Sequence, residues 1–102
     1  MTLTTKKRTL VTVITEAVIE ESLLSDLEKL GVRGYTVLDA RGRGSRGVRD
    51  GAYDLAANIR IEVICSRSLA ESVIQHIQTH YYANYAMVAF LQDIEIFRPE
   101  KF

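Results

Sequence analysis

Glycine and arginine alternate in one segment of this 102-residue chain. Residues 40–57 hold four of the six glycines and four of the nine arginines, and the part from Arg41 to Arg49 contains no acid. Glycines let the backbone turn its N–H groups toward an anion, and arginine offers a charged, planar fork that matches phosphate or carboxylate oxygens. The segment therefore predicts an anion site, with a solvated connection between two strands as the alternative.

Known phosphate-binding patterns do not describe this segment. The GxxxxGK[ST] loop is absent, and the glycines with GxGxxG spacing (Gly42, Gly44 and Gly47) are followed by a loop and a strand instead of a helix. The run RGRGSRG also resembles arginine–glycine segments that bind RNA. Tyr35 and Phe90 could stack on bases, but no RNP-type run accompanies them. An RNA-binding module therefore stays open as the alternative function.

Other residues that could do chemistry have simpler interpretations. His76 and His80 are four residues apart, but no Cys or acid at matching spacing supports a metal site, so we expect surface histidines. Ser45 has no base beside it that would make it a nucleophile. Cys65 lies on the apolar face of a predicted strand and is expected in the core. We therefore expect no catalytic residue, no metal and no enzymatic activity.

The composition is that of one ordinary globular domain, residues 1–102. The chain has 13 Lys and Arg and 13 Asp and Glu, so no overall field draws it to nucleic acid or an anionic membrane. No apolar run approaches the roughly 20 residues of a membrane span, and the first residues lack the apolar core of a signal peptide. A single cysteine excludes an internal disulfide. We expect a cytoplasmic protein.

Hydrophobic periodicity predicts the elements that must hold the glycine–arginine segment. Strands are expected where β-branched residues or strict alternation dominate, and helices where apolar residues recur every three or four positions. The predicted strands are Arg8–Thr15, Val32–Asp39, Asn58–Ser66 and Met87–Phe97. The predicted helices are Ala17–Leu30 and a second one from Ser68 to about Tyr82.

Local signals refine these boundaries. Gly31 is expected to end the first helix in a left-handed conformation, and Gly34 suggests a bulge or close approach inside the second strand. Ser68 and Glu71 fit a capping box at the start of the second helix. The polar pair 92–93 interrupts the last strand and suggests another bulge.

This order of elements predicts an α+β fold, a ferredoxin-like βαββαβ sandwich with both helices on one face of an antiparallel sheet. A long flexible loop, at about residues 40–57, joins the second and third strands. Val, Ile and Leu occupy both faces of the predicted strands. We therefore expect a homo-oligomer in which neighbouring subunits cover the open face.

Several runs resemble the PII-like signalling proteins of inorganic-carbon metabolism. They are GYTV at 34–37, GRGSRGVR at 42–49, NIRIE at 58–62 and YYANYA at 81–86. One branch of these proteins accompanies a bicarbonate transporter of cyanobacteria, and another is associated with the carboxysomes of chemoautotrophic bacteria. The resemblance implies a compact homotrimer of sensors rather than enzymes, with adenine nucleotides in three clefts between neighbours. Residues 40–57 would be the T-loop, flexible when empty and ordered by ligands.

The resemblance also assigns residues one by one. Thr36 would lie near the adenine. The base of the T-loop would contact the ribose and phosphates through Gly42, Gly44 and Ser45. The backbone of a second loop would line the nucleotide cleft at Ala86, Met87 and Val88.

Three arginines match the anion-binding positions of these proteins. Arg46 and Arg49 would contact phosphate or bicarbonate, and Arg98 lies where classical PII proteins carry phosphate-binding arginines. Classical PII proteins have a lysine near Met87, which this chain lacks, so triphosphate binding is expected to be weaker. The chain ends RPEKF without the cysteine-pair extension of many cyanobacterial relatives, which favours the carboxysome-associated branch. The role of Tyr53 in the loop stays open.

The expected function is therefore a sensor of AMP, ADP, ATP or cyclic AMP, with bicarbonate adding at Arg46 and Arg49. The T-loop would act on a bicarbonate transporter or a carboxysome-related protein and so regulate inorganic-carbon uptake or carboxysome function. Contact with a membrane would occur only through a transporter, and no nucleic-acid partner is expected.

Overall fold

The computed structural model describes residues 3–42 and 58–98. In chain order the elements are β1 (Lys6–Glu16), the 3-10 turn η1 (Ala17–Ile19), α1 (Glu20–Leu30), β2 (Thr36–Ala40), β3 (Asn58–Cys65), α3 (Arg67–His80) and β4 (Met87–Ile96). This is the βαββαβ order that the sequence predicts, and the ferredoxin-like fold class is confirmed. Within the described ranges no helix is both long and apolar enough to cross a membrane.

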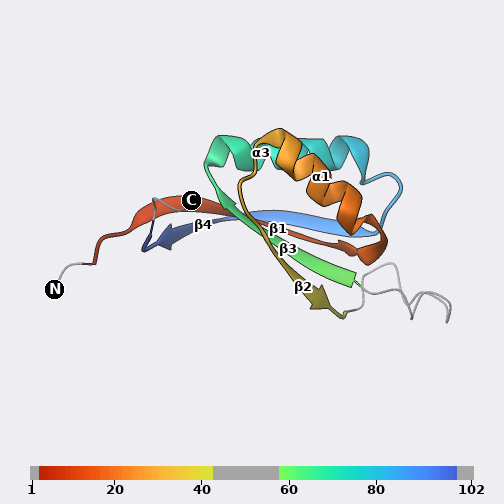
Figure 1. The fold of residues 1–102 in the computed structure, drawn as a ribbon, viewed down its shortest axis with the longest axis horizontal. Coiled ribbons are helices and arrows are strands. Elements are labelled where there is room, and N and C mark those ends of the chain that lie inside the picture. Colours follow the sequence, from red (N-terminus) through yellow and green to blue (C-terminus); the bar gives the residue numbers. More distant parts are fainter. Residues whose placement is uncertain (1–2, 43–57, 99–102) are drawn as a thin grey trace.

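One antiparallel sheet carries the strands in the order β2-β3-β1-β4. Both helices lie on the same face of this sheet, as Figure 1 shows. The helices are the connections from β1 to β2 and from β3 to β4, and right-handed crossovers place both on one side. The opposite face of the sheet has no covering layer among the described residues.

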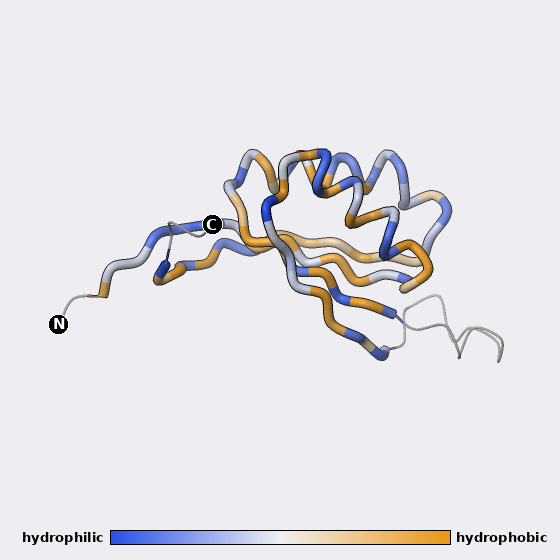
Figure 2. The backbone as a smooth tube through the Cα atoms, in the orientation of Figure 1, coloured by the Kyte–Doolittle hydropathy of each residue, from blue (hydrophilic) through white to orange (hydrophobic). Residues whose placement is uncertain are grey.

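The core lies between the sheet and the two helices. In β3 the burial alternates strictly, since Ile59, Ile61, Val63 and Cys65 are buried and the residues between them are half-buried. The buried face of α1 carries Leu23 and Leu27, and that of α3 carries Ala70, Val73 and Ile77. Figure 2 shows hydrophobic segments of the strands beneath the helices and more hydrophilic segments on the outer turns of the helices. Cys65 lies in this core, as its place on the strand predicts.

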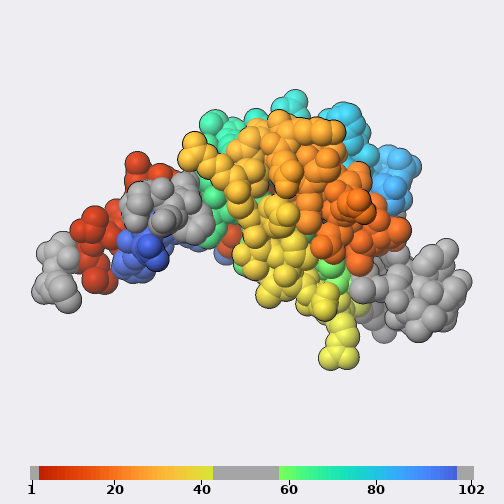
Figure 3. Space-filling model, viewed as in Figure 1, coloured from red at the N-terminus to blue at the C-terminus, as the bar shows by residue number. Residues whose placement is uncertain are grey.

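Strands β1 and β4 continue beyond the rest of the sheet. The pairing of β1 with β3 ends at Thr9 and Cys65, whereas the pairing of β1 with β4 continues to Lys6 and Ile96. The extension forms a two-stranded ribbon that projects past the helices (Figure 3). Isolated two-stranded ribbons are marginally stable in water, so this one gains from contact with another surface.

The open face of the sheet is partly apolar. Its exposed hydrophobic side chains include Leu38 in β2 and Val88 and Phe90 in β4, which are 44%, 50% and 37% exposed. Ile14 lies between Leu38 and Val88 in the same row across the sheet, through the pairs with Arg60 and Val88. Arg60 separates Leu38 from Ile14 in this row, but several exposed hydrophobic side chains on one face of a sheet are still typical of an interaction site.

Two expected boundaries are wrong. The first helix does not begin at Ala17, because residues 17–19 form a 3-10 turn and the α-helix starts at Glu20. The second strand begins at Thr36 rather than Val32. Gly31 ends the helix with a φ of 106°, and the Val32 N–H then donates to the carbonyl of Leu27 at 3.0 Å, so Val32 belongs to the helix end.

Three finer expectations are also wrong. Gly34 precedes β2 and therefore marks no bulge within it. The cap of α3 is Ser66, whose Oγ accepts from the Leu69 N–H at 3.3 Å, instead of a capping box at Ser68 and Glu71. Residues 92 and 93 pair with Leu10 and Thr9 in regular register, so β4 has no bulge there.

Candidate functional site

Several segments predicted to border the nucleotide cleft lie at one end of the sheet. The end of β2, the start of β3, the end of β1 and the start of β4 all lie there, because the row Asp39, Ile59, Thr15 and Met87 crosses all four strands. Gly42 follows the end of β2 by two residues. The structure therefore brings Gly42 and the segment at 86–88 to the same end of the sheet.

The backbone at Ala86 is held by the end of β1. The Ala86 N–H donates to Oε2 of Glu16 at 2.9 Å, and the buried Thr15 donates its Oγ1 proton to the Ala86 carbonyl at 3.0 Å. Met87 is half-buried and packs against the core, whereas Val88 faces the open side of the sheet. These bonds fix the position at which β4 begins, before any ligand is considered.

Thr36 lies on the open face at the start of β2, on the same face as Leu38 and Ala40. It pairs with Glu62, which pairs with Thr12, which in turn pairs with Phe90. Thr36 is exposed, and Arg60 Nε donates to Glu62 Oε2 at 3.0 Å on the same face. Thr36 therefore lies beside an ion pair and the exposed apolar side chains of the open face.

Thr12 has a distinctive environment in this row. Its side chain is fully buried at the centre of the sheet, and its Oγ1 has no hydrogen-bond partner among the described residues. Burying an unpaired hydroxyl costs free energy, about 1–3 kcal/mol by mutational measures.

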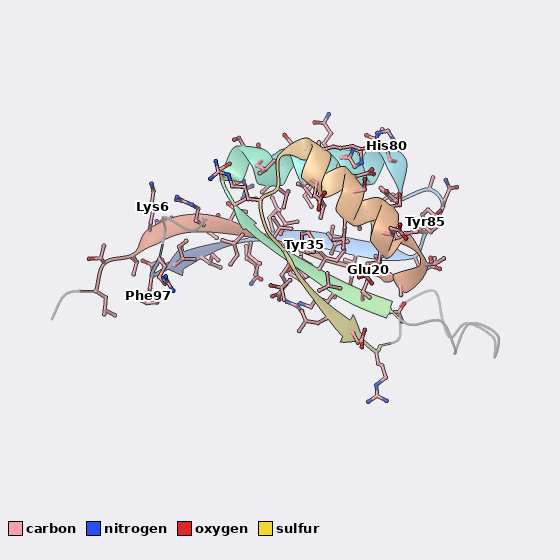
Figure 4. All side chains as sticks on the ribbon, in the orientation of Figure 1. Lys6, Glu20, Tyr35, His80, Tyr85 and Phe97 are labelled. Carbon is pink, nitrogen blue, oxygen red and sulfur yellow. The ribbon has the colours of Figure 1, made fainter. Side chains whose placement is uncertain are left out.

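Arg98 lies at the opposite end of the sheet. It follows the end of β4, whose ten residues span about 30 Å at the usual rise of a strand, whereas Ala86 precedes the start of that strand. Figure 4 shows Lys6 and Phe97 at the ribbon end of the sheet and Glu20 and Tyr85 at the other end. A single subunit therefore does not bring Arg98 together with the residues at 86–88.

The remaining predicted site residues fall outside the described ranges. They are Gly44, Ser45, Arg46 and Arg49. Their assignment to phosphate or bicarbonate contacts stays a prediction.

A cluster of polar side chains between α1 and α3 was not anticipated as a unit. Oδ2 of Asp26 accepts from the Tyr81 hydroxyl at 2.7 Å and lies 2.8 Å from His76 Nε2, and the Tyr81 hydroxyl lies 2.9 Å from Oγ of Ser22. His76 is half-buried in this cluster, so its expected surface position is only partly correct. The four-residue spacing of Ser22 and Asp26, which places both on one helix face, is the signal that could have indicated it.

The electrostatics of this cluster follow from its hydrogen bonds. Burial raises the pKa of Asp26, but the hydrogen bonds from Tyr81 and His76 outweigh it and leave that pKa below its usual value. Burial and the neighbouring Asp26 raise the pKa of Tyr81. The carboxylate is therefore ionised and the phenol protonated near neutral pH. Across residues 3–42 and 58–98 no group of three or more His, Cys, Asp or Glu could hold a metal ion.

A basic concavity lies at the two-stranded ribbon of β1 and β4. Its volume is about 580 Å³, and it is lined by Lys7, Arg8, Thr9, Ser66, Arg67 and Asp93. Arg67 is already engaged, since its Nε contacts Glu71 at 3.1 Å and its Nη1 lies 3.7 Å from Asp93. The concavity is at the far end of the sheet from the segment at 86–88.

A sandwich of two helices on one face of a four-stranded antiparallel sheet, in the order βαββαβ, belongs to the ferredoxin-like class of folds. The family model for nitrogen regulatory protein P-II matches residues 8–101, and the chain belongs to this family.

Solved structures of similar proteins cover almost the whole chain. A PII-like signalling protein from Thermus thermophilus is 35% identical, with a TM-score of 0.82 over 98% of this chain and 99% of the other. CPII from Thiomonas intermedia, bound to ADP and bicarbonate, is 26% identical, with a TM-score of 0.85 over 99% of both chains. CPII bound to ADP, AMP and acetate gives 25% identity and a TM-score of 0.84 over 98% of both chains.

Proposed function

We propose that this chain is a PII-like sensor of adenine nucleotides that assembles as a homotrimer in the cytoplasm. ADP, AMP, ATP or cyclic AMP binds in clefts between neighbouring subunits, and bicarbonate adds to the same site. The observation that carries the proposal is the full-length similarity to CPII, whose structure holds ADP and bicarbonate.

The geometry of one subunit supports a cleft that two subunits share. Thr36, Gly42 and the backbone at 86–88 face one end or the open side of the sheet, whereas Arg98 lies at the other end. An anion that contacts both sets must therefore lie between two copies. The partly apolar open face supplies the surface on which such copies pack.

The chemistry of the site follows from the charges of its arginines. Phosphate groups neutralise Arg46 and Arg49, and each charge-assisted hydrogen bond contributes about 1.5–3 kcal/mol. Bicarbonate is a planar oxyanion that can take the place of a missing phosphate group beside the same arginines. Ligand binding then changes how residues 40–57 contact a bicarbonate transporter or a carboxysome-related protein, and this contact regulates inorganic-carbon uptake or carboxysome function without catalysis.

Isothermal titration calorimetry tests the proposal. The purified protein is titrated with AMP, ADP, ATP and cyclic AMP, each with and without bicarbonate. We expect saturable binding near one nucleotide per subunit and a gain in affinity with bicarbonate. Binding of no nucleotide would refute the sensor, and affinity that grows with RNA length and falls steeply with salt would establish the RNA-binding alternative.

Arginine variants test the assigned contacts. Arg46→Ala should weaken nucleotide binding at least tenfold, whereas Arg33→Ala, which removes an exposed arginine before β2, should leave the affinity within twofold. Equal affinities for Arg46→Ala and the unmodified protein would show that the assignment of Arg46 is wrong.

Mixed trimers test whether two subunits build each cleft. If Arg46 and Arg98 come from different subunits, refolding an equal mixture of Arg46→Ala and Arg98→Ala chains restores about a quarter of the clefts, because each position is intact in half of the chains. No restoration, with both variants separately defective, would place the two arginines in clefts built by one subunit.

A further inference from the structure

We propose that Asp26 and Tyr81 are positioning residues for the nucleotide cleft. Through them α1 holds the turn of residues 81–86, and the turn in turn sets the backbone at Ala86 and Met87. This inference rests on the proposed function, because the backbone at these two residues is assigned to the cleft there.

Tyr81 connects the helix pair to the turn. Its side chain is only 6% exposed, and its hydroxyl donates to Oδ2 of Asp26 on α1 at 2.7 Å. Its main chain serves the turn, since its carbonyl accepts from the N–H groups of Asn84 and Tyr85, each at 3.1 Å. Its N–H also donates to the Ile77 carbonyl at the end of α3 at 2.9 Å, so Tyr81 joins both helices to the carbonyl on which the turn is built.

The hydrogen bonds around the Tyr81 hydroxyl have one consistent direction. The Tyr81 proton goes to Asp26, so the same oxygen can only accept from Ser22, whose Oγ lies 2.9 Å away. His76 Nε2 contacts the same carboxylate oxygen at 2.8 Å. Asp26 thus fixes a side chain from α3 and one from the turn at a single point on α1.

The other end of the turn is equally fixed. The Ala86 N–H donates to Glu16, and its carbonyl accepts from Thr15. Between the two anchors, residues 82–84 are exposed and Tyr85 is half-buried, so little burial holds them. Figure 4 shows Tyr85 at the end of the sheet where β1 ends and β4 begins. The path of the backbone into Ala86 is therefore set by Tyr81 on one side and β1 on the other.

Substitutions at Asp26 separate positioning from general stability. Asp26→Ala removes the acceptor, whereas Asp26→Asn keeps an amide oxygen that can accept from the Tyr81 hydroxyl. Val63→Ala serves as the control, because it opens a cavity in the core on β3 and leaves the helix cluster and the turn intact. ADP affinity is measured by calorimetry for each variant, and thermal unfolding is recorded in parallel.

We expect Asp26→Ala to lose at least tenfold in ADP affinity and Asp26→Asn to stay within threefold of the unmodified protein. Val63→Ala should stay within twofold, although its melting temperature falls about as much as that of Asp26→Ala. Equal losses in Asp26→Ala and Val63→Ala would overturn the inference, since the cluster would then act only through stability. Unchanged affinity in Asp26→Ala would overturn it as well.

Amide hydrogen exchange keeps the inference testable if the proposed function fails. Should the unmodified protein bind no adenine nucleotide, the sensor is refuted, but Asp26→Ala should still speed exchange at Tyr85 by at least tenfold relative to Val63→Ala. Unchanged exchange at Tyr85 would show that Asp26 does not position the turn.

Discussion

Replacement of Phe90 by lysine should dissociate the proposed homotrimer. Phe90 lies on β4 in the row that crosses the centre of the open face, and 37% of it is exposed in the single subunit. Ala89 and Leu91, its neighbours in the chain, pack against the core on the other face, so the Phe90 side chain lies on the open face of the sheet, away from that core. The substitution therefore tests the surface rather than the core.

The expected magnitude follows from the exposed area. With about 200 Å² for a phenylalanine side chain, the exposed part is about 75 Å², and its burial is worth about 1.9 kcal/mol per subunit. Three copies in a trimer give about 5.6 kcal/mol, which corresponds to about four orders of magnitude in the association constant. Burial of three lysine ammonium groups in the interface weakens the assembly further.

Sedimentation velocity over a range of protein concentrations is the assay. Phe90→Lys should sediment as a smaller species at concentrations where the unmodified protein is a trimer, with circular dichroism confirming that it is folded. Tyr82→Lys is the matched control, because Tyr82 is 39% exposed but lies in the turn after α3. Identical sedimentation of Phe90→Lys and the unmodified protein would refute the role of the open face, and Val88→Lys repeats the test at a second position.

Two further predictions concern stability. The pKa of Asp26 is lowered in the folded state, so its ionised form stabilises the fold at pH values above about 4, where the unfolded side chain is also ionised, and this contribution is lost as the pH falls through the folded pKa. Urea unfolding from pH 7 to pH 3 should therefore show a smaller loss of stability in Asp26→Asn than in the unmodified protein; an equal loss would contradict the assignment. Ser66→Ala removes the cap of α3 and should cost about 1 kcal/mol in urea unfolding, with Ser68→Ala costing less than half of that. Equal costs of the two substitutions would instead support a capping box at Ser68.

The elements of the fold were predictable because their signals are local. Strict alternation marks β3 from Asn58 to Cys65, and Gly31 marks the end of α1 through its left-handed conformation. The start of β2 was not predictable from the same kind of signal. Val32 is apolar and fits a strand, but its N–H completes the end of the helix at Leu27. Whether Val32 begins a strand or completes the end of the helix is decided by contacts that form only in the folded chain.

The candidate site was predictable only in part, for a related reason. The glycine–arginine segment is visible in the sequence because its composition is unusual. The contact of Glu16 with Ala86 joins residues 70 positions apart, and that of Asp26 with Tyr81 joins residues 55 apart. No periodicity links such residues. They become neighbours only when the sheet and the helix pair have formed.

The central place of β1 in the sheet also constrains how the chain folds during synthesis. Its partners in β3 lie 42 to 56 residues later, and those in β4 lie 72 to 90 residues later. At about 5–20 residues per second, a ribosome takes roughly 4–16 s to pass from the end of β1 to the end of β4. During that time the strand RTLVTVIT has unpaired edges and resembles an aggregation-prone segment. The nascent chain is therefore a natural client for chaperones until its last strand emerges.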